Sequence, residues 1–425
     1  MRCQPLVLIL VLLLVGCQGS PNPPHNTDPL APTPLPTPTP VQAGGEAERL
    51  SQGSMQIILG FPQADSWGDC QPALCQSLRD LIQQAERSLD FAFYGIRGQP
   101  QILTALTQAQ ARGIPIRGVV DSDAQGRNIY ADTPKLQALI PGIASDQEDE
   151  QLRLNRDPDA RQRIMHHKFL IKDGCTVWTG SANVSDTDIG GYSANLGAVI
   201  QSCEVGSWYQ QELEQMRAGF YNQSKISLRD PEIAVHLAPD VRLRVYFSPQ
   251  DDPAQAVVRA IQESQSQIDV AMFYLTHPEI AKALIAAHQR GVKVRVITDA
   301  TAAANPYSQH QALRQAGIPV KVENWGGKMH MKAAAIDQQV LILGSMNWTR
   351  AGSRFNDENT LIAESAVLSQ ALHGFFQQLW DTIPNRWLTT DPRPESPDSP
   401  GSCRDGLDND HDGRIDARDP DCPQG

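Results

Sequence analysis

Two stretches of the sequence decide the fold: residues 166–183 read HHKFLIKDGCTVWTGSAN, and residues 330–347 read HMKAAAIDQQVLILGSMN. Both contain His-x-Lys, then Asp, then Gly-Ser-x-Asn. A constant offset of 164 residues relates every matched position, which indicates an internal duplication. The matched pairs are His166/His330, Lys168/Lys332, Asp173/Asp337, Ser181/Ser345 and Asn183/Asn347.

The duplication extends upstream of these stretches. Residues 82–123 and 261–300 each read as a helix, a buried strand, a second helix that stops at Arg-Gly, and a β-branched strand that runs into Asp. The buried strands LDFAFY and IDVAMFY are typical of a sheet covered on both faces. This alternation predicts an α/β fold with two duplicated α/β sandwich lobes, at residues 54–235 and 236–387.

The repeated motif places chemically useful groups together. Residues two apart in a strand point to the same face, so His-x-Lys puts an imidazole beside an ammonium group. His167 points to the opposite face and is expected to be structural or on the surface. The chain then turns and returns as a second strand, which brings the Asn of Gly-Ser-x-Asn back beside this pair. Four further motif residues are expected to be structural: Asp173, Asp337, Ser181 and Ser345.

Two copies of HxKxxxxD, each followed by GSxN, resemble the phospholipase D superfamily over residues 55–387. The resemblance implies two lobes packed about a pseudo-twofold axis, with one shared active site and no metal in catalysis. One His attacks phosphorus and forms a phosphohistidine, while the other protonates the leaving alkoxide and then activates water or an alcohol. Because both motifs lie in one chain, a monomer is expected. The resemblance assigns charge stabilisation to Lys168, Lys332, Asn183 and Asn347.

The resemblance makes His166 the nucleophile and His330 the general acid, with one departure. The superfamily commonly has a carboxylate shortly after GSxN that orients the His, and Glu358 matches it for His330. The corresponding position in the first half is Ala194. Either another acid orients His166, or the two His residues exchange roles.

The N-terminus predicts export. MRCQPLVLILVLLLVGCQGS combines a basic start, an apolar run too short to span a bilayer, and a small-residue end. LVGC resembles the lipobox of bacterial lipoproteins, which makes residues 1–17 a signal peptide and Cys17 a lipidated N-terminus. The alternative is an ordinary secretion signal with an incidental cysteine. Residues 18–53 are Pro-rich and predict an extended tether to a bacterial membrane, on the periplasmic side of the outer membrane or at the cell surface.

Six of the eight cysteines remain once Cys3, in the signal peptide, and Cys17 are set aside. This even number permits disulfides in an exported protein. Neighbours are expected to pair, and metal binding by these thiols is the alternative, although no CxxC occurs. The expected pairs are Cys70–Cys75, Cys175–Cys203 and Cys403–Cys422.

The C-terminal part of the chain is acidic. The formal net charge is −12, and residues 391–425 contribute ten acids and four Arg to it. Residues 388–402 read as a linker, and residues 403–422 carry Asp at the oxygen-ligand spacing of an EF-hand loop. We expect a structural Ca²⁺ site there, with a merely solvated acidic tail as the alternative. The expected ligands are Asp408, Asp410, Asp412, Asp416 and Asp419.

Several activities share the phosphohistidine chemistry, so the motif does not choose among them. Membrane tethering and an acidic exported chain favour phospholipid as substrate and a membrane surface as partner. The compact halves favour a metal-independent nuclease, with nucleic acid as substrate, and a phosphatidyl transferase similar to cardiolipin synthases is a third possibility. A non-enzymatic lipid-anchored binding module is disfavoured because both His, Lys and Asn sets are intact.

Overall fold

The computed structural model describes residues 53–62, 69–122, 128–146, 163–410 and 412–423, all of which belong to the unit Arg49–Gly425. The expected signal peptide, Cys17 and residues 18–52 of the tether lie outside the described residues. Within the described part of the chain, no helix has the length and apolar character needed to cross a membrane.

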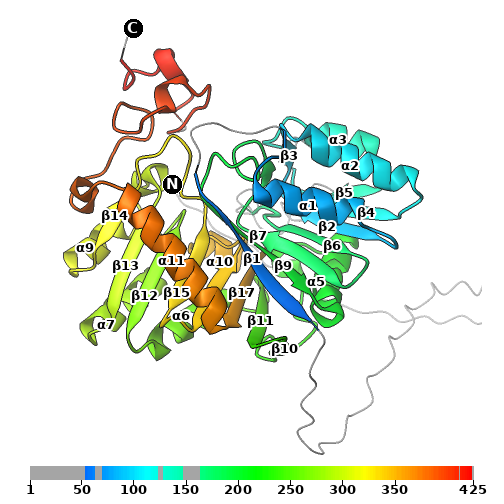
Figure 1. Cartoon of the computed structure of the whole chain (residues 1–425), viewed down its shortest axis with the longest axis horizontal. Helices are drawn as coiled ribbons and strands as arrows, with labels where there is room; N and C mark the ends of the chain where they lie inside the picture. The colour runs from blue at the N-terminus through cyan, green and yellow to red at the C-terminus, as the bar shows by residue number, and fades with distance from the viewer. Residues whose placement is uncertain (1–52, 63–68, 123–127, 147–162, 411, 424–425) are drawn as a thin grey trace, which may run out of the picture. The chain divides into compact units, whose positions relative to one another are not determined.

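The first lobe contains a seven-stranded mixed sheet with helices on both faces (Figure 1). Its elements are β1 (Ser54–Gly60), α1 (Ala73–Gln83), β2 (Leu89–Phe93), β3 (Ile96–Arg97), α2 (Pro100–Ala111), β4 (Ile116–Val120), α3 (Thr133–Leu139), β5 (Ile143–Ser145), β6 (Lys168–Lys172), β7 (Thr176–Gly180), β8 (Val184–Ser185), β9 (Asn195–Gln201) and α5 (Cys203–Arg217).

The second lobe contains an eight-stranded sheet. Its elements are β10 (Val235–Leu237), β11 (Val241–Ser248), α6 (Pro253–Glu263), β12 (Gln267–Met272), α7 (Pro278–Gln289), β13 (Lys293–Thr298), α8 (Ala300–Ala303), α9 (His310–Gln315), β14 (Val320–Val322), β15 (Lys332–Ile336), β16 (Val340–Gly344), α10 (Arg350–Arg354), β17 (Glu358–Glu364) and α11 (Ala366–Thr382). The expected lobe boundary after residue 235 falls inside β10, which pairs with β11 of the second sheet.

The two sheets repeat the same strand order. The first runs β1-β9-β7-β6-β2-β4-β5, and the second runs β11-β17-β16-β15-β12-β13-β14, with β10 added at the edge. In each sheet the last three strands are parallel and the others antiparallel. The two-lobed α/β fold expected from the duplication is therefore present.

The repeated Arg-Gly pair has the same structural role in both lobes. Arg112 donates to the carbonyls of Ile82 and Gln83 at the end of α1, and Arg290 donates to the corresponding carbonyls of α6. These carbonyls lack helical partners, so a side chain that reaches them stabilises the helix end. The following glycines, Gly113 and Gly291, have φ of 84° and 96°, a left-handed conformation that favours glycine.

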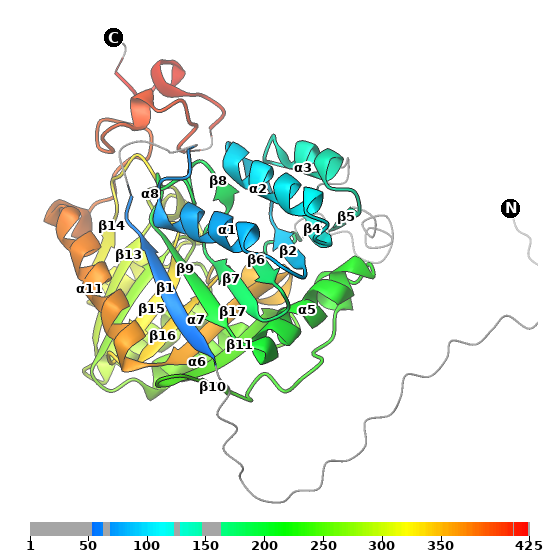
Figure 2. The same ribbon diagram turned by 45° about the vertical axis from the view of Figure 1, so that its right-hand side comes forward.

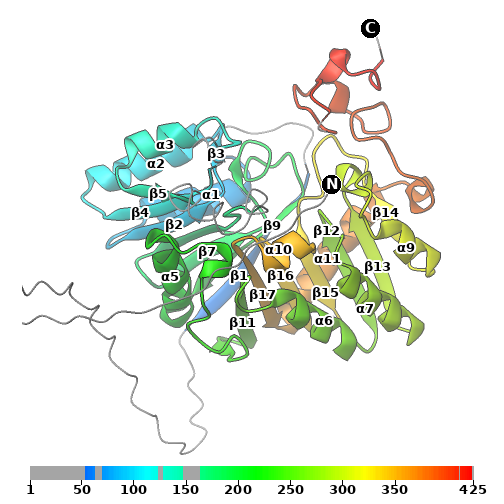
Figure 3. The ribbon, with the colours of Figure 1, turned by 180° about the vertical axis from the view of Figure 1, so that it is seen from behind.

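Apolar side chains pack in three main layers. One cluster lies between α1, α2 and the first sheet, and a second lies between α6, α7 and the second sheet. The third cluster contains α5, α11 and residues of both sheets, and so it joins the two lobes. Figures 1 and 3 view opposite sides of the second sheet, with α11 in front in one and α6 and α7 in front in the other.

All three expected disulfides are confirmed: Cys70–Cys75, Cys175–Cys203 and Cys403–Cys422. The segment 388–402, expected to be a linker, makes side-chain contacts with the second lobe. Asp391 accepts hydrogen bonds from His310 and Arg314, and Glu395 is completely buried. Composition alone did not reveal these contacts, which place the start of the C-terminal segment next to β14 and α9 (Figure 1). The rest of the segment lies at the end of the molecule where α8 is found (Figure 2).

Candidate active site

Each His-x-Lys segment is held by the other lobe. The backbone N–H of His166 donates to Asp357 O (2.9 Å), just before β17, and that of His330 donates to Ala194 O (3.0 Å), just before β9. Asp357 N and Ala194 N donate back to Ile164 and Lys328. These reciprocal bridges bring the two motifs together across the lobe interface, which produces one site rather than two.

A single cavity of about 590 Å³ contains both imidazoles. His166 and His330 line it together with Asn183 and Asn347, so the structure brings together residues from both copies of the motif. Much of the remaining wall is aromatic, from Tyr94, Tyr130, Tyr192, Phe273 and Tyr274.

The two motif lysines are buried next to the His residues. Lys168 Nζ donates to His166 O and Lys332 Nζ donates to His330 O, each at 2.6 Å. Burial lowers the pKa of Lys168 to about 8. Burial, together with repulsion from Lys168, holds the pKa of Lys332 well below its usual value. Burial therefore disfavours the charged forms of both lysines, and a bound anion would raise their pKa values again and stabilise two ammonium groups beside it.

Glu358 orients His166. The Nδ1 of His166 lies 2.8 Å from each Glu358 carboxylate oxygen, and Glu358 is completely buried. Burial lowers the pKa of His166, and repulsion from Lys168 lowers it further. Burial also raises the pKa of Glu358 to about 7. With Nδ1–H donated to Glu358, the lone pair of Nε2 is available for attack.

The expected pairing of Glu358 with His330 is therefore wrong. Glu358 and His330 belong to the same lobe, but the reciprocal bridges place the start of β17 beside the first lobe's motif. The carboxylate that orients His166 therefore comes from the opposite lobe. For this reason, Ala194 at the matched position of the first lobe does not deprive His166 of a carboxylate.

Asn195 and Asp188 orient His330. Its Nδ1 lies 3.1 Å from Asn195 Oδ1 and 3.4 Å from Asp188 Oδ2. Burial raises the pKa of Asp188. The sequence analysis did not identify Asp188, because Gly352 stands at the matched position of the second half. A carboxylate five residues after GSxN was the available signal.

Asp188 also binds Asn183, a residue that was expected to stabilise charge in the transition state. Asn183 donates its amide Nδ2 to Asp188 Oδ2 (2.6 Å), so one of its two amide hydrogens is already used. Asn347 lines the cavity, and its Oδ1 accepts from Tyr274 N (3.4 Å). The two motif asparagines are thus not equivalent.

The remaining motif residues hold the local structure. Asp173 and Asp337 each accept three backbone N–H groups, from residues 86–88 and 265–267. Ser181 Oγ donates to Asn195 Oδ1 (2.8 Å), and Ser345 Oγ accepts from Asn359 N (2.9 Å). His167 is fully buried and contacts Glu212 (3.0 Å), so it lies away from the surface and outside the cavity.

Two buried acid pairs fix the residue before each motif His. Asp121 accepts from Met165 N (2.9 Å), and Asp299 accepts from Met329 N (3.2 Å). Burial and the neighbouring acid Asp146 raise the pKa of Asp121. The equivalent pair in the second lobe is Asp299 and Glu323, where burial and Asp299 raise the pKa of Glu323.

The structure brings four of the five expected calcium ligands near one another and separates the fifth. Carboxylate oxygens of Asp410, Asp412 and Asp419 lie within 4.8 Å of each other, and Asp408 joins Asp410 in a second group. The carboxylate of Asp416 instead accepts from Gly406 N (3.1 Å).

Comparison with known proteins agrees with this geometry. The family described as "Cardiolipin synthase, PLD-like domain" matches residues 78–217 and 257–380, one match in each lobe. A mitochondrial cardiolipin hydrolase of Xenopus laevis is 30% identical over 189 residues, covering 44% of this chain and 88% of the relative. A phospholipase D of Rickettsia typhi is 29% identical, covering 35% of this chain and 75% of the relative.

One solved structure shares the two-lobed fold. The phosphatidylserine synthase of Haemophilus influenzae Rd KW20 aligns with a TM-score of 0.54 at 14% identity, over 78% of this chain and 92% of that structure.

Proposed function

The chain belongs to the phospholipase D superfamily, and on that premise we propose that it hydrolyses phospholipid phosphodiesters through a phosphohistidine intermediate. The observation that carries the proposal is one cavity lined by two imidazoles from different lobes. Each imidazole is oriented by a contact at Nδ1, and two buried lysines lie close to them.

His166 is the nucleophile in this proposal. Its Nε2 lone pair attacks phosphorus while Glu358 accepts the Nδ1 proton in a hydrogen bond, which stabilises the positive charge that develops on the ring. The P–O bond to the leaving group breaks, and His330 gives its Nε2 proton to the departing alkoxide. Lys168 and Lys332 stabilise the charge on the non-bridging oxygens.

The second step reverses these roles. His330, now neutral, takes a proton from water, and the resulting hydroxide attacks phosphorus. The P–N bond to His166 breaks, and a phosphomonoester leaves. The catalytic residues complete both steps without a metal ion, because the two ammonium groups supply the positive charge.

Two observations support phospholipid as the substrate class. The cavity wall is largely aromatic and aliphatic, with Ile129, Ile164 and Leu407 beside the tyrosines. The relatives are named as a cardiolipin hydrolase and a phospholipase D. Nucleic acid is the second candidate, because the same aromatic wall could stack on bases and Arg97 and Lys328 line it.

Parallel incubations test the substrate class. The purified chain in EDTA is given vesicles of cardiolipin or phosphatidylcholine in one arm, and single- or double-stranded DNA in the other. We expect the wild-type chain to release phosphatidate and the His330→Ala variant to release none. DNA cleavage without phosphatidate would overturn the proposal, and phosphatidylethanol formed in added ethanol would indicate transfer rather than hydrolysis.

We also propose that the chain is exported and lipid-anchored through Cys17. The three disulfides support a compartment outside the cytoplasm. Incorporation of labelled palmitate, and its loss in Cys17→Ala, tests the anchor. For the C-terminal Asp-rich segment we propose Ca²⁺ as the ligand, separate from the chemical steps.

A further inference from the structure

The C-terminal segment forms part of the wall of the catalytic cavity. Leu407, Asp408 and Asn409 line the same cavity as His166 and His330. The sequence alone does not reveal this, because 60 residues, 348–407, separate Asp408 from the nearest copy of the motif.

This segment is held by the loop that leads to His330. The carbonyl of Asn409 accepts from Thr301 Oγ1 (2.6 Å) and Lys328 Nζ (3.1 Å), and Asn409 Nδ2 donates to Gly326 O (2.8 Å). Lys328 lies two residues before His330 and lines the cavity as well. A change in the C-terminal segment is therefore transmitted directly to the cavity wall.

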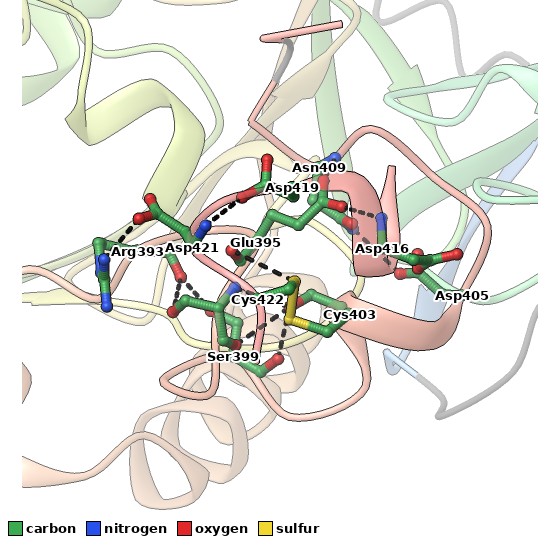
Figure 4. Close-up of a disulfide and its surroundings, with 12 residues drawn as sticks. Arg393, Glu395, Ser399, Cys403, Asp405, Asn409, Asp416, Asp419, Asp421 and Cys422 are labelled. Atoms are coloured by element: carbon green, nitrogen blue, oxygen red, sulfur yellow. Dashed lines mark hydrogen bonds and ion pairs between the residues drawn. A yellow bond between two sulfur atoms is a disulfide. The ribbon is translucent and has the colours of Figure 1, made fainter. Parts of the chain in front are cut away.

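Five carboxylates gather in this segment, in two groups that share Asp410. Glu395, Asp408 and Asp410 form one group, and Asp410, Asp412 and Asp419 form the other, with carboxylate oxygens within 4.8 Å of one another in each. Glu395 comes from the segment expected to be a linker. It accepts from Asn409 N (2.7 Å) and Asp416 N (2.5 Å), which ties the two ends of the loop together (Figure 4).

A buried oxygen in the second group lacks a donor. Asp419 is 1% exposed, and its Oδ1 accepts from Asp421 N (2.6 Å). Its Oδ2 is buried and has no hydrogen-bond partner among the described residues. A buried carboxylate oxygen without a partner is unfavourable, and a bound cation would satisfy it.

Among the residues that the structure describes, little positive charge lies next to these groups. Arg414 Nη1 lies 3.9 Å from Asp412, and Arg393 pairs with Asp421, which belongs to neither group. A cluster of oxygen ligands alone is the donor set that Ca²⁺ prefers.

We propose that Glu395, Asp408, Asp410, Asp412 and Asp419 bind Ca²⁺, and that the bound ion controls entry of the anionic substrate into the catalytic cavity. Asp408 belongs both to the ligand groups and to the cavity wall. Without the ion, these carboxylates repel a phosphodiester at the mouth. With it, their charge is neutralised and the wall is fixed, while the chemical steps still use only His and Lys. The control of entry rests on the proposed function, whereas the binding of Ca²⁺ does not.

Calorimetry on the full chain, freed of metal with EDTA, tests the site itself. We expect Ca²⁺ to bind with a Kd in the range of about 10⁻⁵ to 10⁻³ M, and Mg²⁺ to bind more weakly. Asp410→Asn, which alters the residue shared by both groups, should weaken binding by about tenfold or more. Asp398→Asn removes a carboxylate of the same segment outside the groups and should leave binding unchanged.

Kinetics with the soluble probe bis(4-nitrophenyl) phosphate test the control of entry. Ca²⁺ should lower KM by about tenfold and leave kcat nearly constant, and Asp410→Asn should abolish this difference. Absence of Ca²⁺ uptake by the wild-type chain, or equal losses in Asp410→Asn and Asp398→Asn, would overturn the site. Uptake with an unchanged KM would overturn the control of entry. Ca²⁺ uptake can be measured equally well in the His166→Ala variant, so the test of the Ca²⁺ site does not depend on enzymatic activity.

Discussion

The two halves of the active site contain the same reacting groups in different surroundings. His166 has a fully buried carboxylate on its Nδ1, whereas His330 has the amide oxygen of Asn195 at 3.1 Å and Asp188 at 3.4 Å. Asp188 is shared with Asn183, but Glu358 lies against His166 through both of its oxygens.

In the proposed mechanism, this difference gives the two copies of the motif separate roles. A carboxylate bound tightly to Nδ1 stabilises positive charge on the imidazole, which favours the ring that becomes a phosphohistidine. A weaker, shared acceptor lets the other ring gain and lose a proton during each turnover. The two His-x-Lys segments are alike, whereas the residues that contact each Nδ1 differ.

Removing each imidazole tests the comparison most strongly. His166→Ala and His330→Ala should each lower kcat by at least about 10³-fold, because the two residues act as a unit. After reaction with a phosphodiester labelled with radioactive phosphorus and denaturation in alkaline detergent, which preserves the P–N bond, His330→Ala should carry the label and His166→Ala should lack it. The opposite labelling pattern would exchange the two roles.

Replacing each orienting carboxylate separates the halves. Glu358→Gln should lower kcat by about 10²- to 10⁴-fold with every substrate, since it weakens the nucleophile. Asp188→Asn should slow alkyl phosphodiesters by about tenfold, yet have little effect when the leaving group is 4-nitrophenolate, which needs no proton. Steady-state rates on both substrate types measure this, and equal sensitivity of the two variants to the leaving group would contradict it.

The disulfides distinguish the lobes in stability. The first lobe contains Cys70–Cys75 and Cys175–Cys203, whereas the second contains no cysteine. The double variant Cys175→Ser/Cys203→Ser should lower the free energy of unfolding by about 3 kcal/mol, because the bond closes a loop of 28 residues. Hydrogen exchange should accelerate in β6 and β7 and stay unchanged in β15 and β16. Equal acceleration in both lobes would show that they unfold together.

The pH profile reports the asymmetry of the site. With the Glu358 pKa at about 7, activity should fall about tenfold per pH unit below that value, as the carboxyl gains a proton and stops accepting from His166. Above the Lys168 pKa of about 8, loss of the ammonium charge should lower activity again. In Glu358→Gln the acid limb at about 7 should disappear from the plot of kcat/KM against pH, and its persistence there would assign the limb to another group.

The turn acids should give the smallest effect, and an equal one in both halves. Burial tends to raise the pKa values of Asp173 and Asp337, but the backbone N–H groups they accept outweigh it and lower both. Each carboxylate therefore stabilises the fold above its unfolded pKa, and this contribution is lost as pH falls through the lower folded value. Asp173→Ala and Asp337→Ala should each cost about 1–2 kcal/mol in urea unfolding at neutral pH. The cost should shrink at pH 2.

Sequence patterns predicted much of the fold because each copy of the repeat has the same spacing between its motif residues along the chain. His-x-Lys fixed two side chains on one strand face, and Arg112-Gly113 and Arg290-Gly291 marked two equivalent helix ends. The disulfides followed from the proximity of cysteines along the chain. Asp188 and Glu395 were missed because each acts through a contact that its neighbours in the sequence do not reveal.

The amino-acid sequence by itself determined the duplication, the α/β lobes and the two His-x-Lys pairs of the candidate site, since these depend on periodicity within one strand or helix. Only the tertiary structure decided which residue orients which imidazole, because each His segment pairs with the start of a strand from the opposite lobe. It also decided that the acidic C-terminal segment lines the catalytic cavity, through contacts between residues about 80 positions or more apart, such as Lys328 and Asn409.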